Sequence, residues 1–133
     1  MTPVNLRDAG ETERAVAAFA RSANSGLILT GSALATVHGD LILALANRHK
    51  LPAIYFARYF VIGGGLISYG ADFVDQYRRA AGYVDRILRG EKAADLPVQA
   101  PTKFEMALNL KTARMLGLSI PQTLISTADE VIE

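Results

Sequence analysis

The sequence contains no cysteine, which excludes disulfide bonds, zinc–thiolate centres and thiol catalysis. It also lacks a surplus of charge. Its 14 basic and 13 acidic residues leave a net charge of +1, so it has no electrostatic signature of a nucleic-acid or anionic-membrane partner. No stretch approaches the roughly 18 apolar residues that a membrane-spanning helix needs. The two histidines, His38 and His49, have no carboxylate pattern beside them, and we expect solvated helix residues rather than metal ligands.

The sequence does contain enough apolar material for one folded domain. Half of its 133 residues are hydrophobic and a fifth are charged, a composition that argues against disorder and for a genuine core. Residues 1–20 include acidic side chains and no continuous apolar segment, so we predict no signal peptide. Taken by itself, the chain is expected in the cytoplasm.

Short apolar runs alternate with segments of helical period along most of the chain. The runs predict strands at residues 4–7, 27–29, 53–56, 66–69 and 103–108. The periodic segments predict helices at residues 11–22, 33–49, 73–88 and 111–116. Gly39 could bend the second of these helices or mark a later start. Strands separated by helices imply right-handed crossovers. We therefore predict an α/β fold, with a mostly parallel sheet, flanking helices and a peripheral acidic tail.

The helix expected at residues 73–88 has the clearest pattern. Asp72 precedes it as an N-cap and Gly90 follows it, an arrangement that commonly begins and ends a helix. Charged side chains lie mainly outside one apolar face. That face contains Phe73, Tyr77, Ala80, Ala81, Val84, Ile87 and Leu88. Such a face predicts that the helix packs against other polypeptide.

In open parallel α/β sheets, ligands bind beyond the carboxyl ends of the strands. This rule selects the loops at residues 30–32, 57–59 and 68–72, together with the end of the fifth strand near Asn109. The candidate ligand-binding residues are Ser32, Arg58, Tyr59, Ser68, Tyr69 and Gly70.

Each candidate has a chemical reason and a simpler structural alternative. Arg58 could bind a ligand carboxylate through two hydrogen bonds, or be a solvated loop residue. Tyr59 could stack on an aromatic ligand, and Ser32 could contact the ligand or merely cap the next helix. Residues 68–70 precede a helix N-terminus, whose free N–H groups favour an anion, or they form a plain turn.

Catalysis is not expected. Gly63–Gly65 has neither the lysine and hydroxyl of a P-loop nor the spacing of a dinucleotide-binding motif, so we interpret it as a flexible crossing. Ser68 lies in SYG rather than GxSxG, and neither histidine is placed as its base. We therefore predict no enzymatic activity, no cofactor and no metal.

Three phrases, in this order and spacing, resemble one known family. They are LPAIYFARYFVIGGGLISYG, RRAAGYVDRILRGEKAADLPVQAPTKFEMALNLKTARMLGLSIP and ADEVIE. Together they are similar to the C-terminal portion of ABC transporter substrate-binding proteins of the periplasmic-binding-protein type. The resemblance covers nearly all of this chain but only the last part of the family's length.

The resemblance implies a single α/β unit over residues 1–133 with a partial type I periplasmic-binding-protein fold. Residues 1–60 and 98–133 would belong to the carboxy-terminal lobe, and residues 65–91 would be a strand and helix that return to the amino-terminal lobe. The full-length parent would be periplasmic or extracellular. It would capture a small polar solute, an amino acid or organic acid, in the cleft between its lobes and deliver it to ABC permease subunits. This chain would be a fragment with weak or no binding alone.

The apolar face of residues 73–88 needs a partner if the other lobe is missing. We expect either its own sheet or a second copy, and exchange of the helix across a two-fold axis would give a homodimer. An alternative function is a ligand-sensing or oligomerisation module of a cytoplasmic regulator, because fold alone does not settle function.

Overall fold

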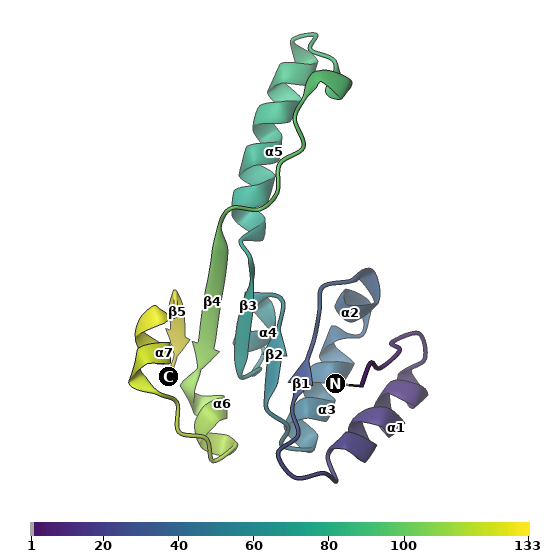
Figure 1. Ribbon diagram of the computed structural model, residues 1–133, viewed down its shortest axis with the longest axis vertical. Coiled ribbons are helices and arrows are strands. Elements are labelled where there is room, and N and C mark those ends of the chain that lie inside the picture. The colour runs from purple at the N-terminus through teal and green to yellow at the C-terminus, as the bar shows by residue number, and fades with distance from the viewer. Residues whose placement is uncertain (1) are drawn as a thin grey trace.

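The computed structural model describes residues 2–133 as strands and helices of one α/β unit (Figure 1). The strands are β1 (Leu27–Ile28), β2 (Ala53–Tyr55), β3 (Ile67–Ala71), β4 (Phe104–Asn109) and β5 (Glu130–Ile132). The helices are α1 (Ala9–Phe19), α2 (Ala33–Val37), α3 (Gly39–Arg48), α4 (Arg58–Ile62), α5 (Phe73–Leu88), α6 (Leu110–Met115) and α7 (Gln122–Thr127), with a 3-10 turn at Ala93–Asp95. Within the described residues, no helix is both long and apolar enough to cross a membrane.

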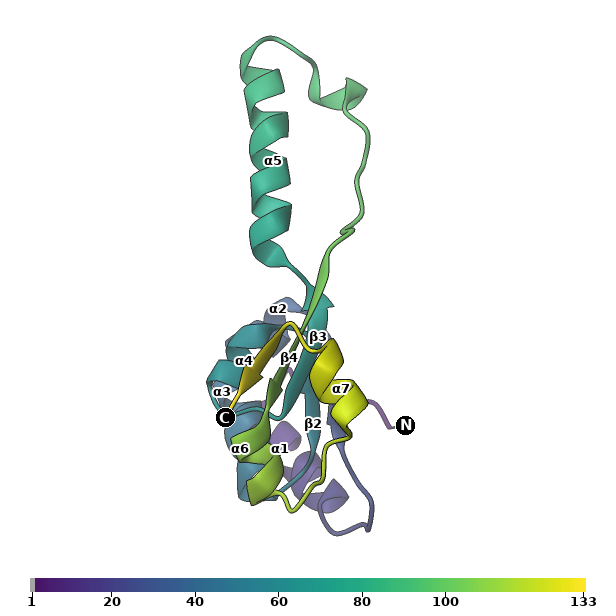
Figure 2. The same cartoon turned by 90° about the vertical axis from the view of Figure 1, so that its left-hand side faces the viewer.

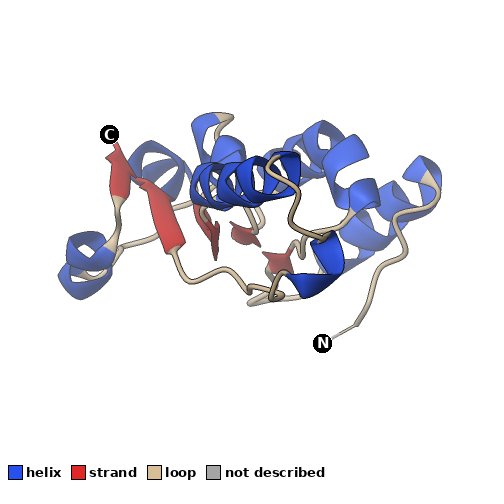
Figure 3. Cartoon of the chain, turned by 90° about the horizontal axis from the view of Figure 1, so that it is seen from above, coloured by secondary structure: helices blue, strands red, loops and turns tan. Residues whose placement is uncertain are grey.

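The five strands form one sheet in the order β1-β2-β3-β4-β5. Three neighbouring pairs are parallel, and β3 with β4 is the antiparallel pair. The predicted α/β class and mostly parallel sheet are therefore confirmed. Figure 2 shows α3 and α4 on one side of the sheet and α7 on the other. Seen from above, most helices lie on one side of the strands (Figure 3).

The main core lies between the sheet and the helices α2 to α4. Tyr55 on β2 stacks on Phe60 of α4 with ring centroids 4.8 Å apart, and both side chains are only 2% exposed. The buried residues of this core are Leu29, Ala35, Ile42, Ala46, Ala53, Tyr55, Ala57 and Phe60. A second cluster of Val16, Leu45 and Leu51 fixes α1 against α3.

The strand expected at residues 4–7 is wrong. Residues 4–7 form no strand, because the polar groups there serve the start of α1. The Thr12 hydroxyl donates to the carbonyl oxygens of Asn5 and Asp8, and local side-chain bonds of this kind compete with strand pairing. The helix expected at residues 33–49 is two helices, α2 and α3, which meet at His38, and α3 begins at Gly39, where a bend or a later start was expected.

The break between α2 and α3 has a packing reason at Gly39. A Cβ atom at Gly39 would lie 2.9 Å from Cε1 of Phe60, closer than packed side chains normally approach. Glycine at this position therefore lets α3 lie directly on the buried ring of Phe60.

The sequence prediction missed α4 and β5. Gly63–Gly65 ends α4 and is not a crossing, since the Gly65 N–H donates to the Phe60 carbonyl at 2.7 Å and Gly64 has φ of +103°, as in a helix C-cap. The acidic tail is not merely peripheral, because β5 pairs in parallel with β4.

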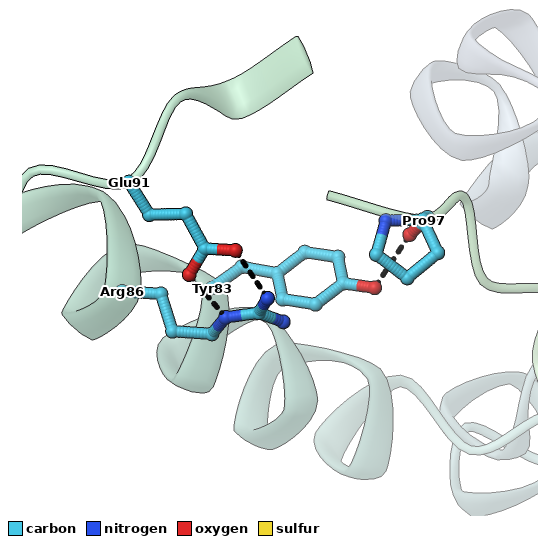
Figure 4. A network of polar contacts seen from close by, with 4 residues as sticks. All are labelled: Tyr83, Arg86, Glu91 and Pro97. Carbon is cyan, nitrogen blue, oxygen red and sulfur yellow. Dashed lines mark hydrogen bonds and ion pairs between the residues drawn. The ribbon is translucent and has the colours of Figure 1, made fainter. Parts of the chain in front are cut away.

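The helix α5 projects away from the rest of the chain, as Figures 1 and 2 show. Its bounds match the predicted residues 73–88, and none of its residues is buried. The chain returns to β4 beside α5. Near the tip, the Tyr83 hydroxyl donates to the Pro97 carbonyl, and Arg86 pairs with Glu91 (Figure 4). These contacts connect α5 to the returning segment.

Candidate functional site

The strand directions bring the three predicted loops to one edge of the sheet. Because β1, β2 and β3 run parallel, residues 30–32 and 57–59 follow the carboxyl ends of β1 and β2 at this edge. Residues 68–72 form the carboxyl-terminal part of β3 and the residue after it. The antiparallel β4 and its parallel neighbour β5 begin here, so Phe104 and Glu130 lie at the same edge. This is the edge at which α/β sheets bind ligands.

Phe56, directly after β2, is the point where the loops meet. A Cβ atom on Gly31 would lie 3.3 Å from the Phe56 ring, and one on Gly70 would lie 1.9 Å from the Phe56 carbonyl oxygen. The backbone of β3 therefore passes the end of β2 at a distance that permits only glycine. Gly70, predicted as a ligand residue, has a structural reason to be glycine at this edge.

Arg58 lines a cavity of about 290 Å³ with residues of β4, β5 and the turn before β5. Its guanidinium lies 2.8 Å from the Glu130 carboxylate, and both side chains are partly exposed. The Asp129 carboxylate accepts a hydrogen bond from the Met106 N–H at 2.8 Å. The other lining residues are Glu105, Met106 and Ala107. The cavity thus holds one cation and three carboxylates, a set that can bind a solute carrying both charges.

Ser32 and Tyr59 lie at the edge in different roles. The Ser32 hydroxyl accepts a hydrogen bond from the Ala35 N–H at 3.0 Å and caps α2, which is the simpler alternative named for it above. Tyr59 is 47% exposed, and its ring packs against Phe56 and Phe60. Tyr59 follows Arg58 in the sequence, and the part of its side chain that these rings leave uncovered is exposed to solvent.

Ser68 and Tyr69 point to opposite faces of the sheet, because side chains alternate along a strand. Ser68 is 1% exposed and lies with Tyr55 and Ala107 on the face that α4 covers. Its hydroxyl has no hydrogen-bond partner within the described residues. Tyr69 is 58% exposed and stacks on Phe104 with ring centroids 5.8 Å apart. Neither Ser68 nor Tyr69 lines the Arg58 cavity, although their partners on β4, Ala107 and Met106, do.

The suggestion that Asn109 joins the site is wrong. It assumed a parallel fifth strand, but β4 runs antiparallel to β3, which places Asn109 at the opposite edge. Asn109 is 5% exposed. Its amide donates to the Val61 carbonyl at 3.2 Å, and its oxygen caps α6 by accepting from the Thr112 N–H at 2.9 Å. The residue has a structural role.

Sequence analysis did not predict an ion pair at the neck, the point between the sheet and α5 where β3 leads into the helix and the chain returns to β4. The Lys103 ammonium lies 2.8 Å from the Asp72 carboxylate, and the Asp72 N–H donates to the Lys103 carbonyl at 3.0 Å. Hydrogen bonds from Lys103 and from the Asp75 N–H lower the pKa of Asp72, and the same contact raises the pKa of Lys103. The two residues are distant in sequence, so the β3–β4 pairing had to be known to find them.

The neck pair predicts a measurable titration. In NMR pH titration, the Asp72 carboxyl should have a pKa below that of an ordinary aspartate, and Lys103→Met should move it upward. Because the pKa of folded Asp72 lies below the unfolded value, its stabilising contribution is present above the unfolded pKa and is lost as pH falls through the folded pKa. Lys92→Met, at the far end of the returning segment, is the matched control. An Asp72 that titrates normally in the unmodified chain would contradict this prediction.

The described residues contain no cluster of three metal-ligating side chains arranged to hold an ion. Two carboxylates of the Arg58 cavity are instead engaged, Glu130 with Arg58 and Asp129 with the backbone N–H of Met106.

Comparison with known proteins shows which family and which solved structures nearly the whole chain is similar to. The sequence profile of a family described as ABC transporter substrate binding protein matches residues 1–132. No curated protein matches the chain.

Solved structures share the fold over part of their length. A conserved domain protein from Vibrio cholerae has a TM-score of 0.82 and 24% identity, over 93% of this chain and 42% of that one. An ABC domain from Streptococcus pneumoniae in complex with L-Trp has a TM-score of 0.81 and 24% identity, over 94% and 43%. A ligand-free, open substrate binding protein with adhesive properties from Clostridium difficile has a TM-score of 0.62 and 18% identity, over 94% and 41%. The chain therefore spans less than half the length of each protein, and the predicted partial fold is confirmed.

Proposed function

This chain belongs to the ABC transporter substrate-binding protein family, and on that premise we propose that it supplies one side of a cleft that captures an amino acid. The longer protein would be periplasmic or extracellular and would pass the solute to ABC permease subunits. It would do so by hinge closure of two lobes over the ligand, without chemistry on the solute.

The observation that carries this proposal is the charge set of the Arg58 cavity. Arg58 can bind a ligand carboxylate through two parallel hydrogen bonds. Glu105, Asp129 and Glu130 line the same cavity and supply acceptors for an ammonium group. A simple organic acid has no ammonium group to pair with these three carboxylates, and its own carboxylate would be repelled by them. The cavity therefore favours an amino acid over an organic acid.

An aromatic side chain on that amino acid fits the surroundings. Tyr59 follows Arg58 and exposes nearly half of its surface, enough for stacking on a planar group. The similar ABC domain from Streptococcus pneumoniae was solved in complex with L-Trp, which supports testing tryptophan first.

The lobe assignment explains why the affinity of this chain alone should be low. We assign residues 1–60 and 98–133 to the carboxy-terminal lobe and residues 65–91 to a segment that reaches toward the other lobe. The Arg58 cavity is open, and its ion pair is partly exposed, so water competes with any ligand. A half-site of this kind should bind in about the millimolar range.

An NMR titration of the chain with L-tryptophan tests the function. Chemical-shift changes should concentrate at residues 30–32, 57–59 and 129–130. Arg58→Gln should weaken binding at least tenfold, because a neutral amide cannot form the two charged hydrogen bonds of the guanidinium. Arg48→Gln is the matched control, since Arg48 also forms an exposed ion pair, with Glu13 at 3.3 Å, but at the end of α3 rather than at this edge.

A second ligand tests separately how the ammonium group and the carboxylate of the amino acid are recognised. Indole-3-propionate keeps the carboxylate and the ring but lacks the ammonium group, so it should bind more weakly than L-tryptophan. Equal binding of both ligands would refute the role of the carboxylates. Shifts that ignore Arg58→Gln would refute the site itself.

A further inference from the structure

The cation of the Arg58 cavity already has a carboxylate partner within the chain. Nη2 of Arg58 lies 2.8 Å from Oε2 of Glu130. Glu130 is the first residue of β5, and both side chains line the cavity. A solute carboxylate that binds Arg58, as the proposed function requires, therefore meets Glu130 at the same guanidinium group.

The atom of Arg58 that Glu130 contacts decides whether the two carboxylates can share the guanidinium. This group has two edges that can each bind a carboxylate through two hydrogen bonds. One edge consists of Nε and Nη2, and the other consists of Nη1 and Nη2, so both include Nη2. A solute carboxylate on either edge would share Nη2 with Glu130, and carboxylates that share one site repel each other. Binding through two hydrogen bonds therefore requires Glu130 to leave Arg58.

We propose that Glu130 exchanges partners when the solute binds, releasing Arg58 to the solute carboxylate and pairing with the solute ammonium group. This inference rests on the proposed function, and it makes Glu130 the residue that selects an α-amino acid. An α-amino acid carries its carboxylate and its ammonium group on the same carbon atom. The ammonium group therefore arrives beside the carboxylate that Arg58 releases. A solute with a carboxylate alone displaces Glu130 and offers it no new partner.

The other two carboxylates of the cavity do not have this role. Asp129 accepts a hydrogen bond from the Met106 N–H at 2.8 Å, and its own N–H donates to the Met106 carbonyl at 2.9 Å, so it is held by the backbone of β4. Glu105 forms no ion pair with any residue that the structure describes. It adds negative charge to the cavity without holding Arg58. Of the three, Glu130 is the carboxylate that a solute must displace.

The ion pair is weak enough to be exchanged and strong enough to discriminate between solutes. The side chains of Arg58 and Glu130 are 49% and 38% exposed, and an ion pair in water of this kind changes an equilibrium constant by at most about fivefold. The pairing of β5 with β4 runs through the backbone, with Glu130 in register with Ala107. Rotation of the Glu130 side chain alone can therefore complete the exchange. A solute without an ammonium group should lose about fivefold in affinity for breaking the pair.

Titrations of Glu130→Gln with L-tryptophan and indole-3-propionate, followed by NMR, test the exchange. Glutamine keeps the size of the side chain and removes its charge, so Arg58 is free for a solute carboxylate. Indole-3-propionate should bind about fivefold more tightly than it binds the unmodified chain. L-Tryptophan gains the same free Arg58 but loses its ammonium partner, so its affinity should stay the same or fall. The preference for L-tryptophan over indole-3-propionate should therefore fall by about fivefold or more.

Glu105→Gln is the matched control for charge. This variant removes one carboxylate from the same cavity and leaves Glu130 paired with Arg58. The affinity for indole-3-propionate should rise by about twofold or less, because only a repulsion screened by water and salt is removed. An equal gain in Glu105→Gln and Glu130→Gln would show that the net charge of the cavity selects the solute, and it would overturn the exchange of partners.

The same titrations separate a failure of this inference from a failure of the proposed function. If L-tryptophan causes no shifts, or causes shifts that persist in Arg58→Gln, both are overturned. If binding depends on Arg58 and Glu130→Gln keeps the full preference for L-tryptophan, the exchange of partners is overturned and the proposed function stands. Glu105 and Glu130 are both partly exposed, so circular dichroism should show that each glutamine variant is folded like the unmodified chain.

Discussion

Replacing Gly70 with alanine is expected to lower the free energy of unfolding by more than about 3 kcal/mol, at or beyond the upper end of the usual overpacking cost. The new Cβ atom would lie 1.9 Å from the Phe56 carbonyl oxygen and 2.9 Å from its carbonyl carbon. Both are backbone atoms, so no rotamer change relieves the clash. Relief requires the end of β2 to separate from β3, and the loops of the candidate site would separate with them.

Urea denaturation of the two proteins measures this effect, and Gly82→Ala is a matched control of opposite sign. Gly82 lies within α5, and a Cβ atom there would meet nothing within 4 Å. Alanine in an exposed helix interior should stabilise α5 by up to about 1 kcal/mol relative to glycine. A Gly70→Ala protein as stable as the unmodified chain would show that the approach of β3 to Phe56 is not needed for folding.

The local elements of this fold could be predicted because their signals are local. The bounds of α5 follow from Asp72, whose carboxylate accepts from the Asp75 N–H at 3.0 Å, and from a continuous apolar period. Family membership and the partial α/β fold, both expected from the ordered phrases, are confirmed. The assignment of residues 65–91 to a second lobe stays a prediction.

The elements that were missed depend on contacts distant in sequence. The helix α4 is five residues long, too short to show a period, and packs through Phe60 and Val61, which are nearly unexposed. The direction of β4 is set by the long excursion through α5, because a chain that leaves and re-enters at the same edge must return antiparallel. Glu130 reaches the site only because β5 joins β4.

The same direction of β4 limits what could be said of the candidate site. The rule that ligands bind beyond the carboxyl ends of parallel strands correctly predicted that the loops after β1, β2 and β3 lie at one edge of the sheet. It could not supply Glu105, Asp129 and Glu130, which reach that edge from the amino ends of β4 and β5. It also could not separate Ser68 from Tyr69, whose faces are decided by the position of α4. The ligand-binding role of the predicted residues stays a prediction.

The second large effect is expected at Asn109, the residue that β4 carries to the opposite edge. Asn109→Ala should lower the free energy of unfolding by about 1.5–2.5 kcal/mol. The loss of the α6 cap contributes about 1 kcal/mol. The loss of the buried hydrogen bond to the Val61 carbonyl, which keeps its bond from the Gly64 N–H at 3.1 Å, contributes about 0.5–1.5 kcal/mol. Binding of L-tryptophan should be unchanged, because Asn109 lies away from the Arg58 cavity.

Two further variants separate the contributions at Asn109. Asn109→Asp keeps the oxygen that accepts from the Thr112 N–H but loses the donor to Val61, so it should retain the cap and still be destabilised. Asn47→Ala, at an exposed position of α3, should change stability by less than about 0.5 kcal/mol, as for an ordinary surface site. If Asn109→Ala instead weakened L-tryptophan binding without loss of stability, the opposite-edge placement of Asn109 would be refuted, and with it the antiparallel pairing of β4 that defines the candidate site.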